Sequence, residues 1–131
     1  MTVWETPEAI PGLSPASMDF AQIWQTADKV VYSRSLETVS TPNTRLEREF
    51  EPQVVNELKA QLPHDISVAG PHLAAQAIRA GLVDEIHLLV VPFILGGGKP
   101  VLPRDIRIKL ELLDERRLGN GWVYFRYRIH D

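Results

Sequence analysis

The middle of the chain has its most regular pattern, in which two short apolar stretches flank an amphipathic one. The first apolar stretch, 66–69, ends at Gly70, and the second, 85–92, follows Gly81. Between them, residues 72–80 have the spacing of a helix, with Gly81 as its C-terminal stop. A strand, a helix and a second strand joined by short turns are typical of a β–α–β unit, whose strands run parallel. The pattern therefore predicts the α/β class.

The flanking sequence predicts further strands and helices around this unit. Ser14-Pro15 is typical of a helix start, because serine caps the first turn and proline there needs no backbone donor. Near the C-terminus, Asn120-Gly121 lies between two alternating stretches and predicts a hairpin. The predicted elements are an irregular segment 1–14, a helix ending near Ala27, a strand at 29–33 buried on both faces, a short strand at 44–49, a helix from Pro52 to Leu62, and hairpin strands at 108–117 and 122–129. Together they predict a mixed sheet with flanking helices and a C-terminal antiparallel hairpin.

Composition excludes several classes of function. The 131 residues include 14 Lys and Arg against 17 Asp and Glu, so no strong positive field favours binding to nucleic acid or an anionic membrane. The lack of cysteine excludes disulfides, thiolate metal sites and a cysteine nucleophile. The longest apolar run, 82–95, is interrupted by charges and is shorter than the roughly 18–20 residues of a membrane span. The first seven residues do not resemble a signal peptide, so we expect a cytoplasmic protein.

Three segments are candidates for ligand binding. Residues 33–35, Ser-Arg-Ser, end a predicted strand and offer a guanidinium and two hydroxyls to a phosphate, although an ordinary solvated strand end is the alternative. Gly70 precedes a helix whose free amides favour an anion, but Pro71 removes one donor, and a tight strand-to-helix turn also accounts for the glycine. The glycines at 96–98 permit either a close approach to a flat ligand or a flexible connection.

The histidines and carboxylates predict no further site. His64, His72, His87 and His130 are dispersed without the spacing of metal ligands, so no metal is expected. We interpret His87 as a hydrogen-bonded histidine of a sheet. Adjacent acidic residues at 84–85 point to opposite faces of a strand and do not meet on one substrate atom. The basic residues after position 99 are interpreted as solvated faces of the hairpin.

Four short motifs together resemble a known family. Their order and spacing are similar to those of the C-terminal reductase domain of the bifunctional riboflavin-biosynthesis deaminase/reductase, and of the stand-alone dihydrofolate-reductase-like proteins related to it. The resemblance runs from about Phe20 to Tyr127. The motifs are Lys29-Val30-Val31-Tyr32-Ser33-Arg34-Ser35-Leu36, Val68-Ala69-Gly70-Pro71, Ala80-Gly81-Leu82-Val83-Asp84-Glu85-Ile86 and Pro92-Phe93-Ile94-Leu95-Gly96-Gly97-Gly98.

This resemblance implies NADPH as hydride donor and assigns its binding to three segments. Ser33 and Arg34 match the family's strand-end motif near the adenosine phosphates. The turn before the helix, which consists of Ala69, Gly70 and Pro71, matches the family's glycine step, which packs against the pyrophosphate. Leu73 follows this turn on the helix and belongs to the same match. Ala69 and Pro71 depart from the glycine-rich form of this motif, so the resemblance does not imply as tight a contact between backbone and pyrophosphate as in the family. The loop of Gly96, Gly97 and Gly98 matches the one near the nicotinamide and substrate.

The resemblance also predicts how much of the domain is present. Family members begin with a strand, a helix and a second strand ending in a Gly-Arg-x-Thr-like motif, which the sequence before Ser14 does not match. We therefore expect residues 1–131 to form a single, partial domain without the family's first two strands, through truncation or an upstream start. Because those strands flank the one at 66–69 in the family, we expect the strands at Val31, Val68 and Val90 to pair directly and the chain to form a homodimer.

The function implied is reduction of a small heterocycle. The resemblance indicates an NADPH-dependent reductase of a pterin- or pyrimidine-like substrate, similar to 5-amino-6-(5-phosphoribosylamino)uracil reductase. No proton donor is assigned, because the matching segment is not in the sequence, and catalysis by this chain alone is expected to be weak or absent. The alternative is a non-catalytic NADP-binding or dimerising remnant of the fold. Neither interpretation includes a nucleic-acid or membrane partner.

Overall fold

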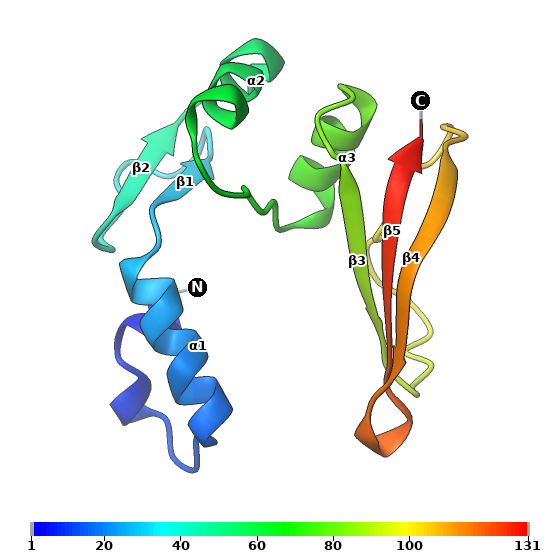
Figure 1. Cartoon of the computed structure of the whole chain (residues 1–131). Helices are drawn as coiled ribbons and strands as arrows, with labels where there is room; N and C mark the ends of the chain where they lie inside the picture. The colour runs from blue at the N-terminus through cyan, green and yellow to red at the C-terminus, as the bar shows by residue number, and fades with distance from the viewer. Residues whose placement is uncertain (1, 131) are drawn as a thin grey trace. The chain divides into compact units, whose positions relative to one another are not determined.

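The computed structural model describes residues 2–130, which form two compact units divided between Phe50 and Glu51. The first unit contains two 3₁₀ turns, η1 (Thr2–Glu5) and η2 (Pro7–Ala9), then α1 (Pro15–Thr26), β1 (Lys29–Tyr32) and β2 (Thr44–Glu47). The second contains α2 (Pro52–Gln61), α3 (Pro71–Arg79), β3 (Glu85–Val90), β4 (Lys109–Arg117), the turn η3 (Gly119–Gly121) and β5 (Val123–His130). Figure 1 shows these elements along the chain.

In the first unit, α1 begins where the sequence predicts it. The Ser14 side chain accepts a hydrogen bond from the Ser17 amide at 3.2 Å, and Pro15 occupies the first turn. Phe20 of α1 packs edge-on against Trp4 of η1, with ring centroids 4.9 Å apart. Residues 2–14, predicted to be irregular, thus contain two short 3₁₀ turns, the first of which packs on α1.

The two strands of the first unit pair in parallel. The register runs from Lys29 opposite Thr44 to Tyr32 opposite Glu47. β1 is half-buried along its whole length, so the prediction of burial on both faces was wrong. β1 and β2 form a two-stranded sheet, whose faces are too narrow for full burial of the strand.

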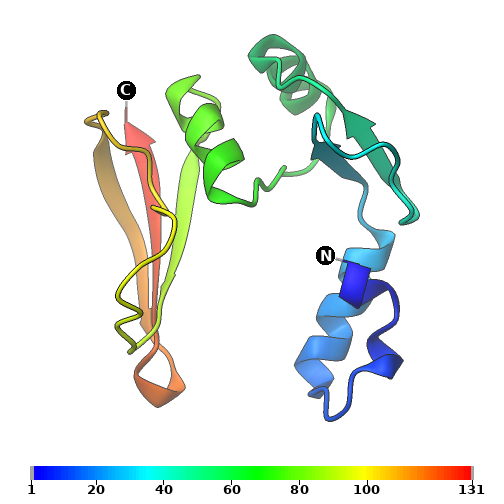
Figure 2. The ribbon, with the colours of Figure 1, turned by 180° about the vertical axis from the view of Figure 1, so that it is seen from behind.

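The second unit is built on a three-stranded antiparallel sheet in the order β3-β5-β4. A hairpin joins β4 to β5, as predicted, and its turn has Asn120 and Gly121 at positive φ. Helix α3 and the connection 91–108 lie over the same face of this sheet, as Figure 2 shows from behind. Ala77 and Ile78 of α3 and the following Leu82 are buried.

The predicted strand at 66–69 is not formed, which corrects the β–α–β prediction. Residues 66–69 have no ladder partner among the described residues, and Ile66 and Val68 are 42% and 39% exposed. β3 pairs instead antiparallel with β5, with Val90 opposite Val123, while Val31 of β1 lies opposite Leu46. Direct pairing of the strands at Val31, Val68 and Val90 was therefore wrong. The backbone groups of β3 bond to β5 of the nearby hairpin, and β3 does not pair with the 66–69 segment.

The class predicted from the sequence is confirmed, since the structure is α/β with both parallel and antiparallel pairing and a C-terminal hairpin. Among the helices of residues 2–130, none has the length and apolarity to cross a bilayer.

Candidate functional site

The loop that follows β1 carries the best-defined candidate site. The Ser33 amide donates to the Glu47 carbonyl at 3.0 Å, which extends the β1–β2 pairing by one bond. The Ser33 hydroxyl then accepts from the Leu36 amide at 3.1 Å and lies 3.4 Å from the Ser35 hydroxyl. Two hydroxyls this close can both bond to one phosphate group. The local turn therefore brings together the two serines that flank Arg34.

Arg34 presents its guanidinium at the surface of the first unit. Its Nη2 lies 3.1 Å from Glu49 Oε1, and the two side chains are 78% and 64% exposed. A pair so exposed contributes little to folding stability, because water already solvates both charges well. The guanidinium is therefore accessible to a phosphate, which competes with Glu49 for it.

At the start of α3, Gly70 supplies a turn that other residues adopt only with strain. Its φ is +90° and ψ 127°. No atom lies within 4 Å of where a Cβ would be, so backbone conformation and not space accounts for the glycine. The Gly70 carbonyl accepts from the Ala74 amide at 2.9 Å, and the first-turn amides after Pro71 are the donors that a helix start offers an anion. Leu73 is half-buried and Ala69 exposed.

The glycine loop after β3 is open. Gly96 and Gly98 have φ of +72° and +138°, and a Cβ at any of the three glycines would meet no atom within 4 Å. The preceding Ile94 is fully exposed, and Phe93 and Leu95 are largely so. Such a segment can approach a flat ligand closely, but no described element packs on these three apolar side chains.

The candidate residues fall in both units. Ser33 and Arg34 belong to the first unit, and the remaining candidates, Ala69, Gly70, Pro71, Leu73, Gly96, Gly97 and Gly98, belong to the second. Within each unit the structure gives their local geometry, and their role in cofactor binding stays a prediction.

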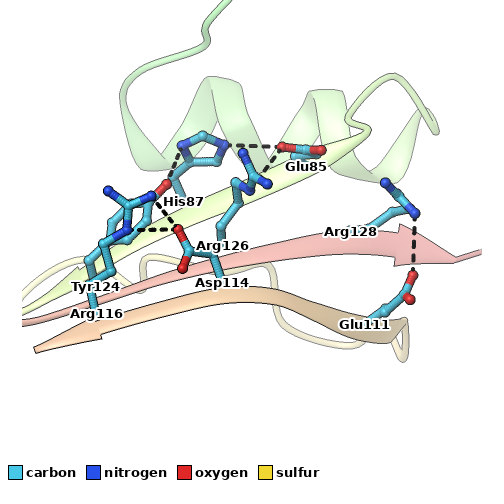
Figure 3. Close-up of polar contacts among 8 residues, drawn as sticks. All are labelled: Glu85, His87, Glu111, Asp114, Arg116, Tyr124, Arg126 and Arg128. Atoms are coloured by element: carbon cyan, nitrogen blue, oxygen red, sulfur yellow. Dashed lines mark hydrogen bonds and ion pairs between the residues drawn. The ribbon is translucent and has the colours of Figure 1, made fainter.

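The sequence did not predict the polar network that lies on the other face of the second unit's sheet. Figure 3 shows it spanning all three strands. His87 lies 3.2 Å from the Tyr124 hydroxyl and 3.4 Å from Glu85, as expected of a hydrogen-bonded sheet histidine. Asp84 bonds instead to Lys59 at 2.6 Å, so the adjacent carboxylates have different partners. The remaining members are Glu111, Asp114, Arg116, Arg126 and Arg128.

The network consists of polar pairs within a strand and between strands, and it does not form a reactive centre. Arg116 pairs with Asp114 at 2.7 Å, and this bond raises the pKa of the Arg116 guanidinium. Arg128 pairs with Glu111 at 3.5 Å across the hairpin. The alternation of side chains along the hairpin strands could have revealed this face, because every second residue of a strand points to the same side of the sheet.

The apolar face holds a separate hollow of about 450 Å³. Four isoleucines line it with Gly81 and four basic residues, and none of the predicted cofactor residues does so; the lining residues are Ile78, Arg79, Gly81, Ile106, Arg107, Ile108, Lys109, Ile129 and His130. Among residues 2–130, no cluster of His, Asp and Glu could hold a metal ion.

Comparison with known proteins identifies the class as an α/β domain of the RibD C-terminal type. Residues 29–124 match the model of the RibD C-terminal domain, so the chain belongs to that family. This match confirms the resemblance noted from the motifs, and it includes every candidate residue.

Three individual proteins are similar to the chain in sequence or in fold. YyaP of Bacillus subtilis (strain 168) is 37% identical over 75 residues, which cover 56% of this chain and 40% of YyaP. A protein assigned to riboflavin biosynthesis from Shewanella sp. PV-4 superposes with a TM-score of 0.70 at 14% identity, over 89% of this chain and 71% of that one. A pyrimidine reductase-like protein from Corynebacterium diphtheriae superposes with a TM-score of 0.54 at 17% identity, over 92% of this chain and 48% of that one. The chain thus spans less than half of YyaP and of the Corynebacterium protein.

Proposed function

We propose that this chain binds NADPH and serves as the reductase domain for a pyrimidine- or pterin-like heterocycle. The observation that carries the proposal is the loop after β1, which lies in the segment that matches the RibD C-terminal domain. There the exposed Arg34 stands between Ser33 and Ser35, whose hydroxyls are 3.4 Å apart. The name of the Corynebacterium relative supports a pyrimidine as the substrate class.

The donor groups of the chain fit this cofactor. The extra 2′-phosphate of NADPH needs a cation and hydroxyl donors, which Arg34, Ser33 and Ser35 offer at the surface. The first-turn amides of α3 suit the pyrophosphate, and the positive φ of Gly70 sets the turn that presents them. The exposed backbone of 96–98 suits the flat nicotinamide side. When bound, NADPH supplies the hydride, and these residues bind and orient it.

A titration of NADPH and NADH, followed by nicotinamide fluorescence, tests the proposal. We expect the chain to bind NADPH more tightly than NADH. Replacing Arg34 by Ala should cost about 1.5–3 kcal/mol of NADPH binding, because a charge-assisted bond to phosphate is lost. The same change should leave the affinity for NADH nearly constant. Equal affinities for the two dinucleotides in the unsubstituted chain would overturn the assignment.

One observation favours a second candidate, a dinucleotide-binding domain without catalysis. Residues 66–69 form no helix or strand and have no ladder partner among the described residues, and a catalytic centre needs its substrate side held firmly. NADPH oxidation in the presence of pyrimidine and pteridine substrates separates the two candidates. Turnover well above background supports the reductase, whereas tight NADPH binding with background turnover supports the binding domain.

A further inference from the structure

Arg48 is the first residue after β2, and its guanidinium bonds to the loop that follows β1. Nη1 donates to the Ser33 carbonyl at 3.1 Å and also to the Leu36 carbonyl. Nη2 donates to the Glu37 carbonyl at 3.2 Å. One side chain thus bonds to the backbone at both ends of the 33–37 loop, which holds the candidate phosphate-binding groups.

The chemistry of this contact requires arginine. A guanidinium has five N–H donors in a rigid planar fork, so two of its nitrogens can satisfy three carbonyls at fixed angles. A lysine ammonium has the same charge but is a single point at the end of a flexible stem. The neighbouring Arg45 shows the contrast, because its guanidinium pairs with the Glu47 side chain at 2.8 Å and not with loop carbonyls.

Arg48 differs from the other two arginines near the loop in the partners that it binds. Glu49 pairs with Arg34 at 3.1 Å and Glu47 with Arg45, whereas the hydrogen bonds of Arg48 go to uncharged carbonyls. Among residues 2–130, no carboxylate forms an ion pair with Arg48, and the loop that it binds itself contains the acidic Glu37. An incoming phosphate therefore meets a turn whose backbone is already held by the Arg48 guanidinium.

We infer that Arg48 is a positioning residue, which holds the 33–37 loop so that Ser33, Arg34 and Ser35 converge on the 2′-phosphate of NADPH. The inference rests on the proposed function. Arg48 acts through the backbone of the loop, whose side chains are the ones assigned to the 2′-phosphate. Its loss should therefore affect NADPH, which has the 2′-phosphate, more than NADH, which lacks it.

The test compares Arg48→Ala and Arg48→Lys with the control Arg45→Ala in the full chain. Dissociation constants for NADPH and NADH are measured for each, with amide hydrogen exchange of residues 34–37 and thermal melting as readouts that need no cofactor. We expect Arg48→Ala to weaken NADPH binding about tenfold through lost preorganisation, to change NADH binding at most twofold, and to speed exchange in the loop. Arg48→Lys should recover only part of the loss, and Arg45→Ala should resemble the unsubstituted chain.

The outcomes separate this inference from the proposed function. If the unsubstituted chain binds NADPH but Arg48→Ala leaves the ratio of the NADH and NADPH dissociation constants unchanged, the inference is overturned and the proposed function stands. Full recovery by Arg48→Lys overturns it too, because charge alone would then account for the effect. If the unsubstituted chain binds neither dinucleotide, the proposed function fails, and exchange in the loop still reports whether Arg48 orders it. Should Arg48→Ala unfold, Arg48→Lys gives the same comparison.

Discussion

At the scale of single residues, Glu49 limits the charge that Arg34 offers to a ligand. The two side chains are exposed and 3.1 Å apart, so a phosphate has to displace the carboxylate. We expect Glu49→Gln to strengthen NADPH binding about threefold, in line with the roughly 0.2–1 kcal/mol of an exposed ion pair. NADH binding and the melting temperature should hardly change. Glu47→Gln, which removes the pair with Arg45, is the matched control, and an equal gain in that variant would contradict the prediction.

Tyr32 makes the first unit sensitive to alkaline pH. Burial raises the pKa of its phenol above the ordinary value, Glu47 acts in the same direction, and Arg45 opposes both. Because the folded state favours the neutral phenol, its contribution to stability is complete below the unfolded pKa of about 10. That contribution is lost as pH rises through the higher pKa of the folded state.

Tyr32→Phe should remove this sensitivity. Phenylalanine keeps the edge-on packing against Phe50, whose ring centroid lies 5.4 Å away, but has no proton to lose. We expect urea midpoints measured between about pH 8 and pH 11 to fall less steeply for Tyr32→Phe than for the unsubstituted chain. Parallel curves for the two proteins would show that Tyr32 does not contribute to the alkaline loss.

At the scale of elements, the turn into α3 depends on the backbone of Gly70. With φ at +90° and free space around the missing Cβ, Gly70→Ala should destabilise the chain by about 1–3 kcal/mol through backbone strain alone. Gly97→Ala is the control, since Gly97 also has free space but no positive φ, and it should cost less than about 0.5 kcal/mol. Urea unfolding of both variants measures the difference. Equal costs would show that strain at Gly70 is not the cause.

Local signals were enough to predict most elements. Ser14 caps α1 through a bond to a residue three positions away, and Asn120-Gly121 closes its hairpin by its own dihedral preferences. The strand at 66–69 failed because a strand also needs a partner, and apolar residues cannot specify which segment pairs with them. In the candidate site too, local signals predict some residues and miss those that depend on contacts distant in the sequence. Ser33 and Arg34 were found from their place after a strand, whereas Arg48 joins their loop through contacts that no sequence spacing indicates.

At the scale of the whole molecule, each unit buries little apolar surface. Among residues 2–130, the buried hydrophobic core consists of Ala21, Ala77, Ile78 and Leu82, of which two are alanines with little area to bury. Folded domains are stabilised by only about 5–15 kcal/mol in total. A core of this size leaves the chain dependent on whatever else covers its apolar groups, such as a bound cofactor or a second copy.

We propose that a second copy supplies this cover and that the chain forms a homodimer. Within the part of the chain that the structure describes, exposed apolar residues with no partner strand or helix occur in the segments 66–69 and 93–95, where Ile94 is fully exposed. Such surface seldom stays bare in a protein that remains in solution. We expect light scattering at micromolar concentration to give twice the chain mass of 14.8 kDa. The melting temperature should rise with protein concentration, because dimerisation favours the folded state by mass action. Ile94→Asp should weaken association, whereas Ile23→Asp, at another exposed isoleucine, should not. A monomer that unfolds cooperatively and binds no apolar dye would contradict the proposal, since the exposed side chains would then need no cover.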